Sequence, residues 1–196
     1  MATPVAKKDG TAQFLFTVSP DASLMNGFRI NGDGSLAPVA GSPFVTGMPM
    51  HSAVSVHQTL VVAGKNTISA FAVDKDTGAI QLTDTVKMGS ISKLVAGHTD
   101  DVVVAKTSAG PTAFRLSEGK LKALPETMAE SELASAKGPP PSAVLDASGR
   151  FMYVTDATKA ELDAFQIENG KPRALSPAAY PLIHGSAAVA LVKPEQ

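Results

Sequence analysis

The stretch Asn66-Thr67-Ile68-Ser69-Ala70-Phe71-Ala72-Val73 is followed by the turn Asp74-Lys75-Asp76-Thr77-Gly78 and then by Ala79-Ile80-Gln81-Leu82. The apolar parts contain residues that favour β-strands, and the Asp and Gly residues between them favour a tight turn. The stretch therefore predicts two antiparallel strands joined by a hairpin turn.

This strand end is repeated along the chain. Its four versions are Gly27-Phe28-Arg29-Ile30, Ala70-Phe71-Ala72-Val73, Ala113-Phe114-Arg115-Leu116 and Ala164-Phe165-Gln166-Ile167. The phenylalanines are separated by 43, 43 and 51 residues. A period of roughly 40 to 50 residues built from short strands is typical of β-propeller blades.

We therefore predict an all-β fold, a β-propeller of four blades with four antiparallel strands each. The predicted blades span approximately residues 11–47 together with 186–193, then 48–89, 90–138 and 139–183. Residues 40–47 are expected to form a connecting loop. Residues 126–137 account for the longer third interval and predict either one or two turns of helix or a longer loop.

The two ends of the chain predict how the ring closes. The first unit has no strand before Phe14, whereas Ser186–Val192 forms a surplus strand at the end. Propellers avoid exposed sheet edges, so we expect the C-terminal strand to pair into the first blade and close the ring. The same pairing between two chains would give a homodimer with a joined ring, and the repeats favour neither arrangement.

Composition excludes several functions. The chain has 196 residues and a formal net charge of −1, so it has no basic field for nucleic acid. It has no cysteine, no phosphate-binding or dinucleotide-binding motif, and no histidine pair at metal-ligand spacing, so we expect no cofactor and no metal. No apolar run is long enough to cross a membrane, and the first ten residues lack a signal-peptide core. A cytoplasmic location is the default expectation, with a secreted or periplasmic origin left open.

Three segments resemble the bacterial lactonase-type β-propellers, which include propeller-fold 6-phosphogluconolactonases and 3-carboxymuconate lactonising enzymes. They are Gly41-Ser42-Pro43-Phe44 with Thr46-Gly47, Asn66–Asp74 with Thr77-Gly78, and Ser142–Val154. The resemblance covers about residues 13 to 193 and implies the propeller fold and lactone hydrolysis. Members of that family are seven-bladed rings of about twice this length, and their active-site acid and arginine have no counterpart here. Their Pro-x-His matches Pro49-Met50-His51, which implies a role for His51.

Candidate site residues follow from the expected geometry. In a propeller, the starts of the first strands and the loops between second and third strands meet at one face, around the channel mouth. That face is expected to collect His51 and His184 as catalytic candidates, Lys65, Asn66, Lys106, Ser142 and Asp156 as ligand-binding candidates, and Asp21, Ser92 and Lys159 nearby. His57 and His98 are expected at the opposite face. Asp74–Gly78 resembles the start of a calcium loop, but the position for its glutamate is Thr85, so a hairpin turn is favoured.

Two functions are compatible with this pattern. A lactonase needs a base that activates water and a donor for the developing oxyanion, for which a histidine and a lysine at the channel mouth would serve. The partner would then be a small polar or carboxylated molecule. The alternative is a non-enzymatic propeller that binds another protein through an exposed apolar or aromatic patch.

Overall fold

The computed structural model describes residues 13–96, 101–107, 109–125, 143–146, 150–156, 159–168, 171–182 and 188–192. These residues form strands and connecting turns, with no helix among them. The described part of the chain thus contains no helix long and apolar enough to cross a membrane. The predicted helix or loop at residues 126–137 lies outside the described residues.

The strands form four antiparallel sheets, as the repeats predict. The first blade is β17 (Ala188–Val192), β1 (Gln13–Val18), β2 (Leu24–Ile30) and β3 (Leu36–Pro38), with β4 (Phe44–Val45) also paired to β2. The second is β5 (Ser52–Val56), β6 (Thr59–Ala63), β7 (Thr67–Val73) and β8 (Ile80–Lys87). The third is β9 (Ile91–Ala96), β10 (Val102–Thr107), β11 (Gly110–Ser117) and β12 (Lys120–Ala123). The fourth is β13 (Ala143–Leu145), β14 (Phe151–Asp156), β15 (Glu161–Glu168) and β16 (Lys171–Pro181).

The C-terminal strand completes the first blade, as predicted. β17 runs antiparallel to β1, with Phe14 opposite Val192 and Val18 opposite Ala188. The expected loop at residues 40–47 is wrong in one detail, because Phe44 and Val45 form the short strand β4 opposite Met25 and Leu24.

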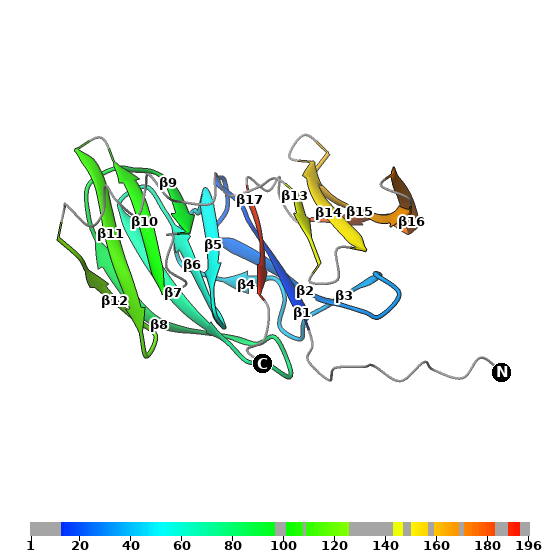
Figure 1. Ribbon diagram of the computed structural model, residues 1–196, viewed down its shortest axis with the longest axis horizontal. Helices are drawn as coiled ribbons and strands as arrows, with labels where there is room; N and C mark the ends of the chain where they lie inside the picture. The colour runs from blue at the N-terminus through cyan, green and yellow to red at the C-terminus, as the bar shows by residue number, and fades with distance from the viewer. Residues whose placement is uncertain are drawn as a thin grey trace.

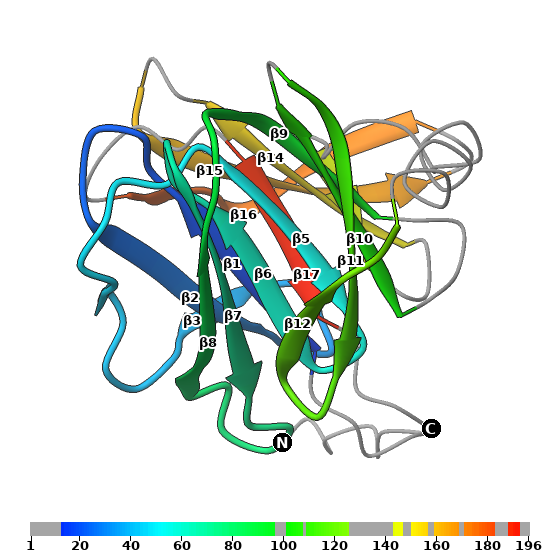
Figure 2. The same cartoon turned by 90° about the vertical axis from the view of Figure 1, so that its left-hand side faces the viewer.

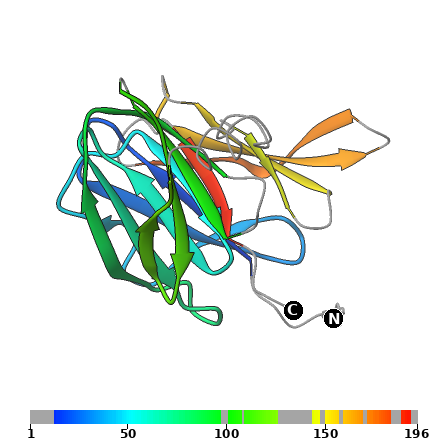
Figure 3. The same ribbon diagram turned by 60° about the vertical axis from the view of Figure 1, so that its left-hand side comes forward.

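The four sheets follow one another in a row. Figure 1 shows the third blade at one end, then the second and the first, and the fourth at the other end. Figure 2 looks along this row from the third blade, and Figure 3 gives an intermediate view. The first strands of the blades are neighbours in the order β9, β5, β17 and β13. Pairing of β17 into the first blade is confirmed, whereas a closed ring also needs contact between the third and fourth blades, and no hydrophobic cluster of the described residues joins them.

Apolar side chains fill the three interfaces between neighbouring blades. One cluster joins the first blade to the second, another joins the second to the third, and a third joins the fourth to the first. We call the face that a blade turns toward the preceding blade its rear face, and the opposite one its front face. The repeated phenylalanines lie on rear faces: Phe71 packs on the first blade, Phe114 on the second and Phe28 on the fourth. The repeated phenylalanine therefore occupies the same position in each of the three interfaces between neighbouring blades.

Glycines in two hairpin turns allow a blade to pack closely against the preceding blade. Gly78 has φ of 76° and a side chain there would collide with the Phe14 ring of the first blade. Gly34 has φ of 84°, and a side chain there would collide with the Phe151 ring of the fourth blade. Glycine is required at such positions both by the left-handed backbone and by the lack of space for a Cβ atom.

The substitution Gly78→Ala should therefore destabilise the protein more than Gly47→Ala. Gly47 has the same φ of 76°, but no atom lies within 4 Å of a Cβ built there. The control measures the backbone cost alone, about 1 kcal/mol, and overpacking against Phe14 should add about 1 to 3 kcal/mol. Urea unfolding of both variants measures the difference. Equal losses of stability in the two variants would show that a side chain at position 78 does not overpack against Phe14.

Two tyrosines bind the first blade to the fourth. The buried Tyr153 hydroxyl donates to the carbonyl oxygen of Gly34 at 2.9 Å, and the amide of Leu36 donates to the Tyr180 hydroxyl at 2.9 Å. Burial raises the pKa of Tyr153 well above its usual value of 10.0, and the nearby Asp146 raises it further. The fold therefore holds Tyr153 in its neutral form.

Because the unfolded chain loses this proton near pH 10 and the folded chain does not, the free energy of unfolding should fall as pH rises above about 10. Tyr153→Phe should lower stability at pH 7 by about 1 kcal/mol through the lost hydrogen bond. It should also make the loss above pH 10 shallower. Urea unfolding between pH 7 and 11 tests both, and an unchanged slope would contradict the assignment of this loss to Tyr153.

Candidate functional site

Backbone hydrogen bonds join successive loops of the first three blades at one end of the sheets, where the rim is predicted. The amide of Met50 donates to the carbonyl of Ser19 at 3.0 Å, which joins the start of the second blade to the β1–β2 turn. The amide of Ile91 donates to the carbonyl of Lys65 at 2.9 Å, which joins the third blade to the β6–β7 turn. We call the set His51, Lys65, Asn66, Ser92 and Lys106 the rim site.

His51 precedes β5 and is the partly buried member of the rim site. Its amide donates to the carbonyl of Ala63 at 2.9 Å, so the strand end fixes its backbone. Its Nε2 atom is buried and has no hydrogen-bond partner among the residues that the structure describes. A buried polar atom without a partner is costly, and each one requires an explanation such as strain, a catalytic role or a bound water. The Nε2 atom of His51 is thus an unsatisfied polar atom within the described part of the chain.

Exposed polar groups surround this end of the second and third blades. Lys65 and Asn66 form the β6–β7 turn and are exposed, as is Lys106 at the end of β10. The Ser92 hydroxyl donates to the carbonyl of Lys106 at 3.1 Å, which ties β9 to β10 at the rim. The described rim therefore carries two exposed ammonium groups and one partly buried imidazole.

Lys93 is a rim residue that the sequence analysis missed. It is partly exposed and lies opposite Lys106 in the register of β9 and β10. Antiparallel partners share a face, so two like charges are placed side by side, an arrangement that costs stability unless an anion is near. Only the register reveals this pair, because the two lysines lie on different strands and are not close in the sequence.

Three of the predicted site residues lie wholly or partly outside the described residues. His184 and Ser142 lie outside the described residues. The backbone of Asp156 ends β14 opposite Glu161, but its side chain is also outside the described part. Their roles remain predictions, while Asp21 and Lys159 are exposed in the β1–β2 and β14–β15 turns.

Serine side chains hold the first strands of neighbouring blades together behind the rim. The Ser52 hydroxyl accepts from the amide of Leu94 at 3.0 Å, which links β5 to β9. The Ser55 hydroxyl donates to the carbonyl of Leu191 at 2.7 Å, which links β5 to β17. These bonds fix the strand that begins directly after His51 from both sides.

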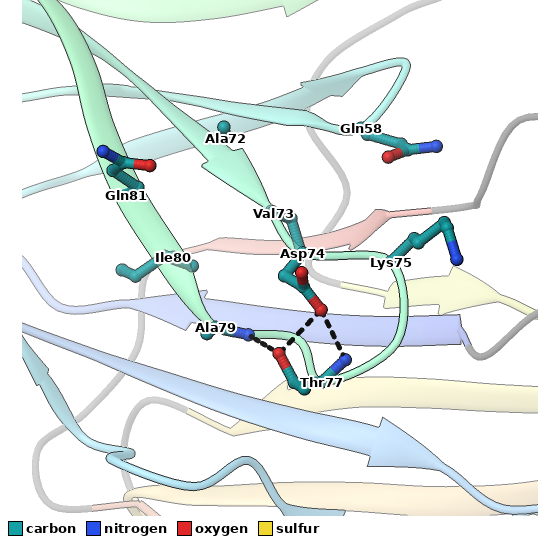
Figure 4. Close-up of a pocket in the computed structure, with 9 residues that line it drawn as sticks. All are labelled: Gln58, Ala72, Val73, Asp74, Lys75, Thr77, Ala79, Ile80 and Gln81. Atoms are coloured by element: carbon teal, nitrogen blue, oxygen red, sulfur yellow. Dashed lines mark hydrogen bonds between the residues drawn. The ribbon is translucent and has the colours of Figure 1, made fainter.

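The opposite end of the second blade carries a shallow pocket of about 560 Å³ beside the β7–β8 turn. Figure 4 shows the Asp74 carboxylate turned into the turn itself, where it accepts from the amide and the hydroxyl of Thr77, each at 2.8 Å. These hydrogen bonds lower the pKa of Asp74. The carboxylate serves the hairpin, as predicted, and the described residues contain no cluster of histidine and acidic side chains that could hold a metal.

His57 lies at this end of the second blade, as predicted, in the β5–β6 turn. It is exposed and has φ of 49°, which is typical of a tight turn. It therefore belongs to the end opposite His51, and His98 lies outside the described residues.

No protein-family model matches the chain, and no curated protein matches it. Solved structures similar to the chain include a candidate 6-phosphogluconolactonase from Bacteroides fragilis, with 16% identity, a TM-score of 0.46, and coverage of 91% of this chain and 56% of that one. A periplasmic gluconolactonase from Pseudomonas aeruginosa has 13% identity, a TM-score of 0.44, and coverage of 88% and 56%. A protein from Lactobacillus plantarum has 15% identity, a TM-score of 0.45, and coverage of 96% and 61%.

The chain thus spans little more than half the length of these structures. Two of the three carry lactonase names. The assignment of the fold rests on the strand pairing and sheet packing of this chain.

Proposed function

We propose that the rim site binds a small polar or carboxylated molecule and hydrolyses a lactone. The observation that carries this proposal is the buried, unpartnered Nε2 atom of His51. It lies on a rim with exposed lysines, so a base and cationic groups are available at the same end of the sheets.

In the proposed reaction, the Nε2 atom of His51 accepts a proton from a water molecule as its oxygen bonds to the lactone carbonyl carbon. The carbonyl oxygen gains negative charge, which an ammonium group of Lys65 or Lys106 stabilises. The ring C–O bond then breaks, and the proton on His51 passes to the leaving oxygen. The product is the open hydroxy acid, and the histidine returns to its neutral form.

The distribution of exposed hydrophobic side chains supports the protein-binding alternative less than it supports the lactonase proposal. The large hydrophobic side chains exposed in the described residues are Val45, 81% exposed on β4, and Leu82, 55% exposed on β8. They lie on different blades, whereas an interaction surface needs a contiguous patch.

The substitution His51→Gln should lower kcat/KM for lactone hydrolysis by roughly 10²- to 10⁴-fold, the usual contribution of a general base. The substrates are gluconolactone and its 6-phosphate, chosen from the names of the similar structures. A pH-stat records acid release after subtraction of the spontaneous rate. Gln keeps the size and polarity of the side chain but cannot take up a proton at neutral pH.

The matched control is His57→Gln, a histidine of the same blade at the opposite end. It should hydrolyse both lactones at the wild-type rate. If His51→Gln also does so, His51 is not the base. If the wild-type protein does not accelerate the hydrolysis of either lactone, these two substrates are wrong, and failure to bind them at the rim would count against the proposed function.

A further inference from the structure

Asparagine followed by glycine is frequent in this chain. Three of its four asparagines precede glycine, in the pairs Asn26-Gly27, Asn31-Gly32 and Asn169-Gly170. In such a pair the side-chain amide of asparagine can react with the backbone nitrogen of glycine, because glycine has no Cβ atom that hinders the approach. The first two pairs are only five residues apart but lie in different environments, and the third lies outside the described residues.

The fold protects the pair Asn26-Gly27. Both residues belong to β2, where Asn26 is only 6% exposed and lies opposite Thr17 of β1. The Gly27 amide already donates to the Ser42 hydroxyl at 2.9 Å. The Nδ2 atom of Asn26 is directed at the Thr17 hydroxyl, 3.4 Å away. The glycine nitrogen and the asparagine side chain can therefore meet only if the strand opens.

The pair Asn31-Gly32 is open by comparison. Both residues are exposed in the turn between β2 and β3. The Gly32 amide makes no hydrogen bond in the described part of the chain, and no atom lies within 4 Å of a Cβ atom built on Gly32. Among the described residues, the Asn31 side chain is held by a single exposed hydrogen bond, from its Nδ2 atom to the Ser35 hydroxyl at 2.9 Å. The glycine nitrogen is thus accessible, and the reactive side chain is only weakly restrained.

We propose that Asn31-Gly32 is a site of spontaneous covalent modification, whereas Asn26-Gly27 is protected by its strand. The Gly32 nitrogen loses its proton and bonds to the Cγ carbon of Asn31, the Cγ–Nδ2 bond breaks, and the side-chain nitrogen leaves as ammonia. The resulting succinimide ring then takes up one water molecule. If the bond between Cγ and the ring nitrogen opens, residue 31 becomes aspartate. If the bond between the main-chain carbonyl carbon and the ring nitrogen opens, it becomes isoaspartate, and the backbone then runs through Cβ.

The modification acts on the contact between the first and fourth blades and is independent of the proposed function. The β2–β3 turn carries Gly34, whose amide donates to the Asn31 carbonyl at 2.9 Å and whose carbonyl accepts from the Tyr153 hydroxyl. Isoaspartate adds a carbon to the backbone at the start of this turn and so shifts Gly34 relative to Tyr153. Aspartate replaces the donor to Ser35 with a carboxylate near Asp33, whose Oδ1 atom already accepts from the Ser35 hydroxyl at 2.6 Å. Both products should weaken the attachment of the fourth blade.

The test is peptide mapping by mass spectrometry while the folded protein is incubated in mildly alkaline buffer. Trypsin separates the two pairs because it cleaves after Arg29, so residues 9–29 and 30–65 form different peptides. Deamidation replaces an NH2 group with OH, and this change in mass is followed in each peptide over time. Conversion at Asn31 should be at least about 100-fold faster than at Asn26, because Asn26 reacts only when its core strand opens.

Incubation in concentrated urea is the control for the intrinsic reactivity of the two pairs. In the unfolded chain both asparagines precede glycine in a flexible backbone, so they should convert at comparable rates. Gly32→Ala is the matched variant, because Gly32 has no positive φ and has free space at its Cβ position. This variant should fold normally, while conversion at Asn31 slows several-fold because the new Cβ atom hinders the approach.

Comparable rates at Asn26 and Asn31 in the folded protein would overturn the proposal, because the strand would then give no protection. So would the absence of conversion at Asn31 over a period in which the urea-treated chain converts, because the turn would then protect it as well. The variant Asn31→Asp tests the structural consequence. It should unfold at a lower urea concentration than the wild-type protein, and an equal midpoint would contradict a weakened contact with the fourth blade.

Discussion

The structure depends on sheets that are apolar on both faces. In β10, Val102 and Val104 face one side while Val103 and Ala105 face the other, and all four are buried. A single sheet of this kind cannot remain in water, because burial of apolar area is the main force that favours folding. Each apolar face therefore requires cover, and packing between neighbouring blades supplies it at three interfaces.

The rim site is a consequence of the same packing. Blades held face to face place their strand ends at a common level, so short loops from successive blades can exchange backbone hydrogen bonds. The bond from Met50 to Ser19 and the bond from Ile91 to Lys65 belong to this series. His51 is positioned by such bonds and by the strand that follows it, and its buried Nε2 atom has no hydrogen-bond partner among the described residues.

Much of this architecture can be predicted from the sequence because it is local and repeated. The strands, their turns and the pairing of the C-terminal strand are encoded in alternating apolar residues and in the surplus strand at the end. The strand β4 cannot be predicted in this way, because two residues carry no pattern and the pairing of Phe44 depends on the position of β2. The repeat also cannot decide between a row and a closed ring, since both use the same interfaces.

In the candidate site, too, some residues can be predicted from the sequence and others cannot. Lys65 and Lys106 were found from their place in loops and strand ends, whereas Lys93 needs the register of two strands that the sequence does not specify. The proposed roles of His184, Ser142 and Asp156 were also inferred from position, and they stay predictions.

The pairing of β17 with β1 has a consequence for the order in which the protein can fold. Residues 13–18 and 188–192 are neighbours in one sheet but are separated by nearly the whole chain. The second and third blades consist of consecutive strands and can form while the chain is still being synthesised. The first blade stays incomplete until residues 188–192 are present, and during that time β1 keeps an unpaired edge and Phe14 and Phe16 lack their strand partners Val192 and Ala190. The completion of the first blade must therefore follow the synthesis of the three blades that lie between its strands in the sequence.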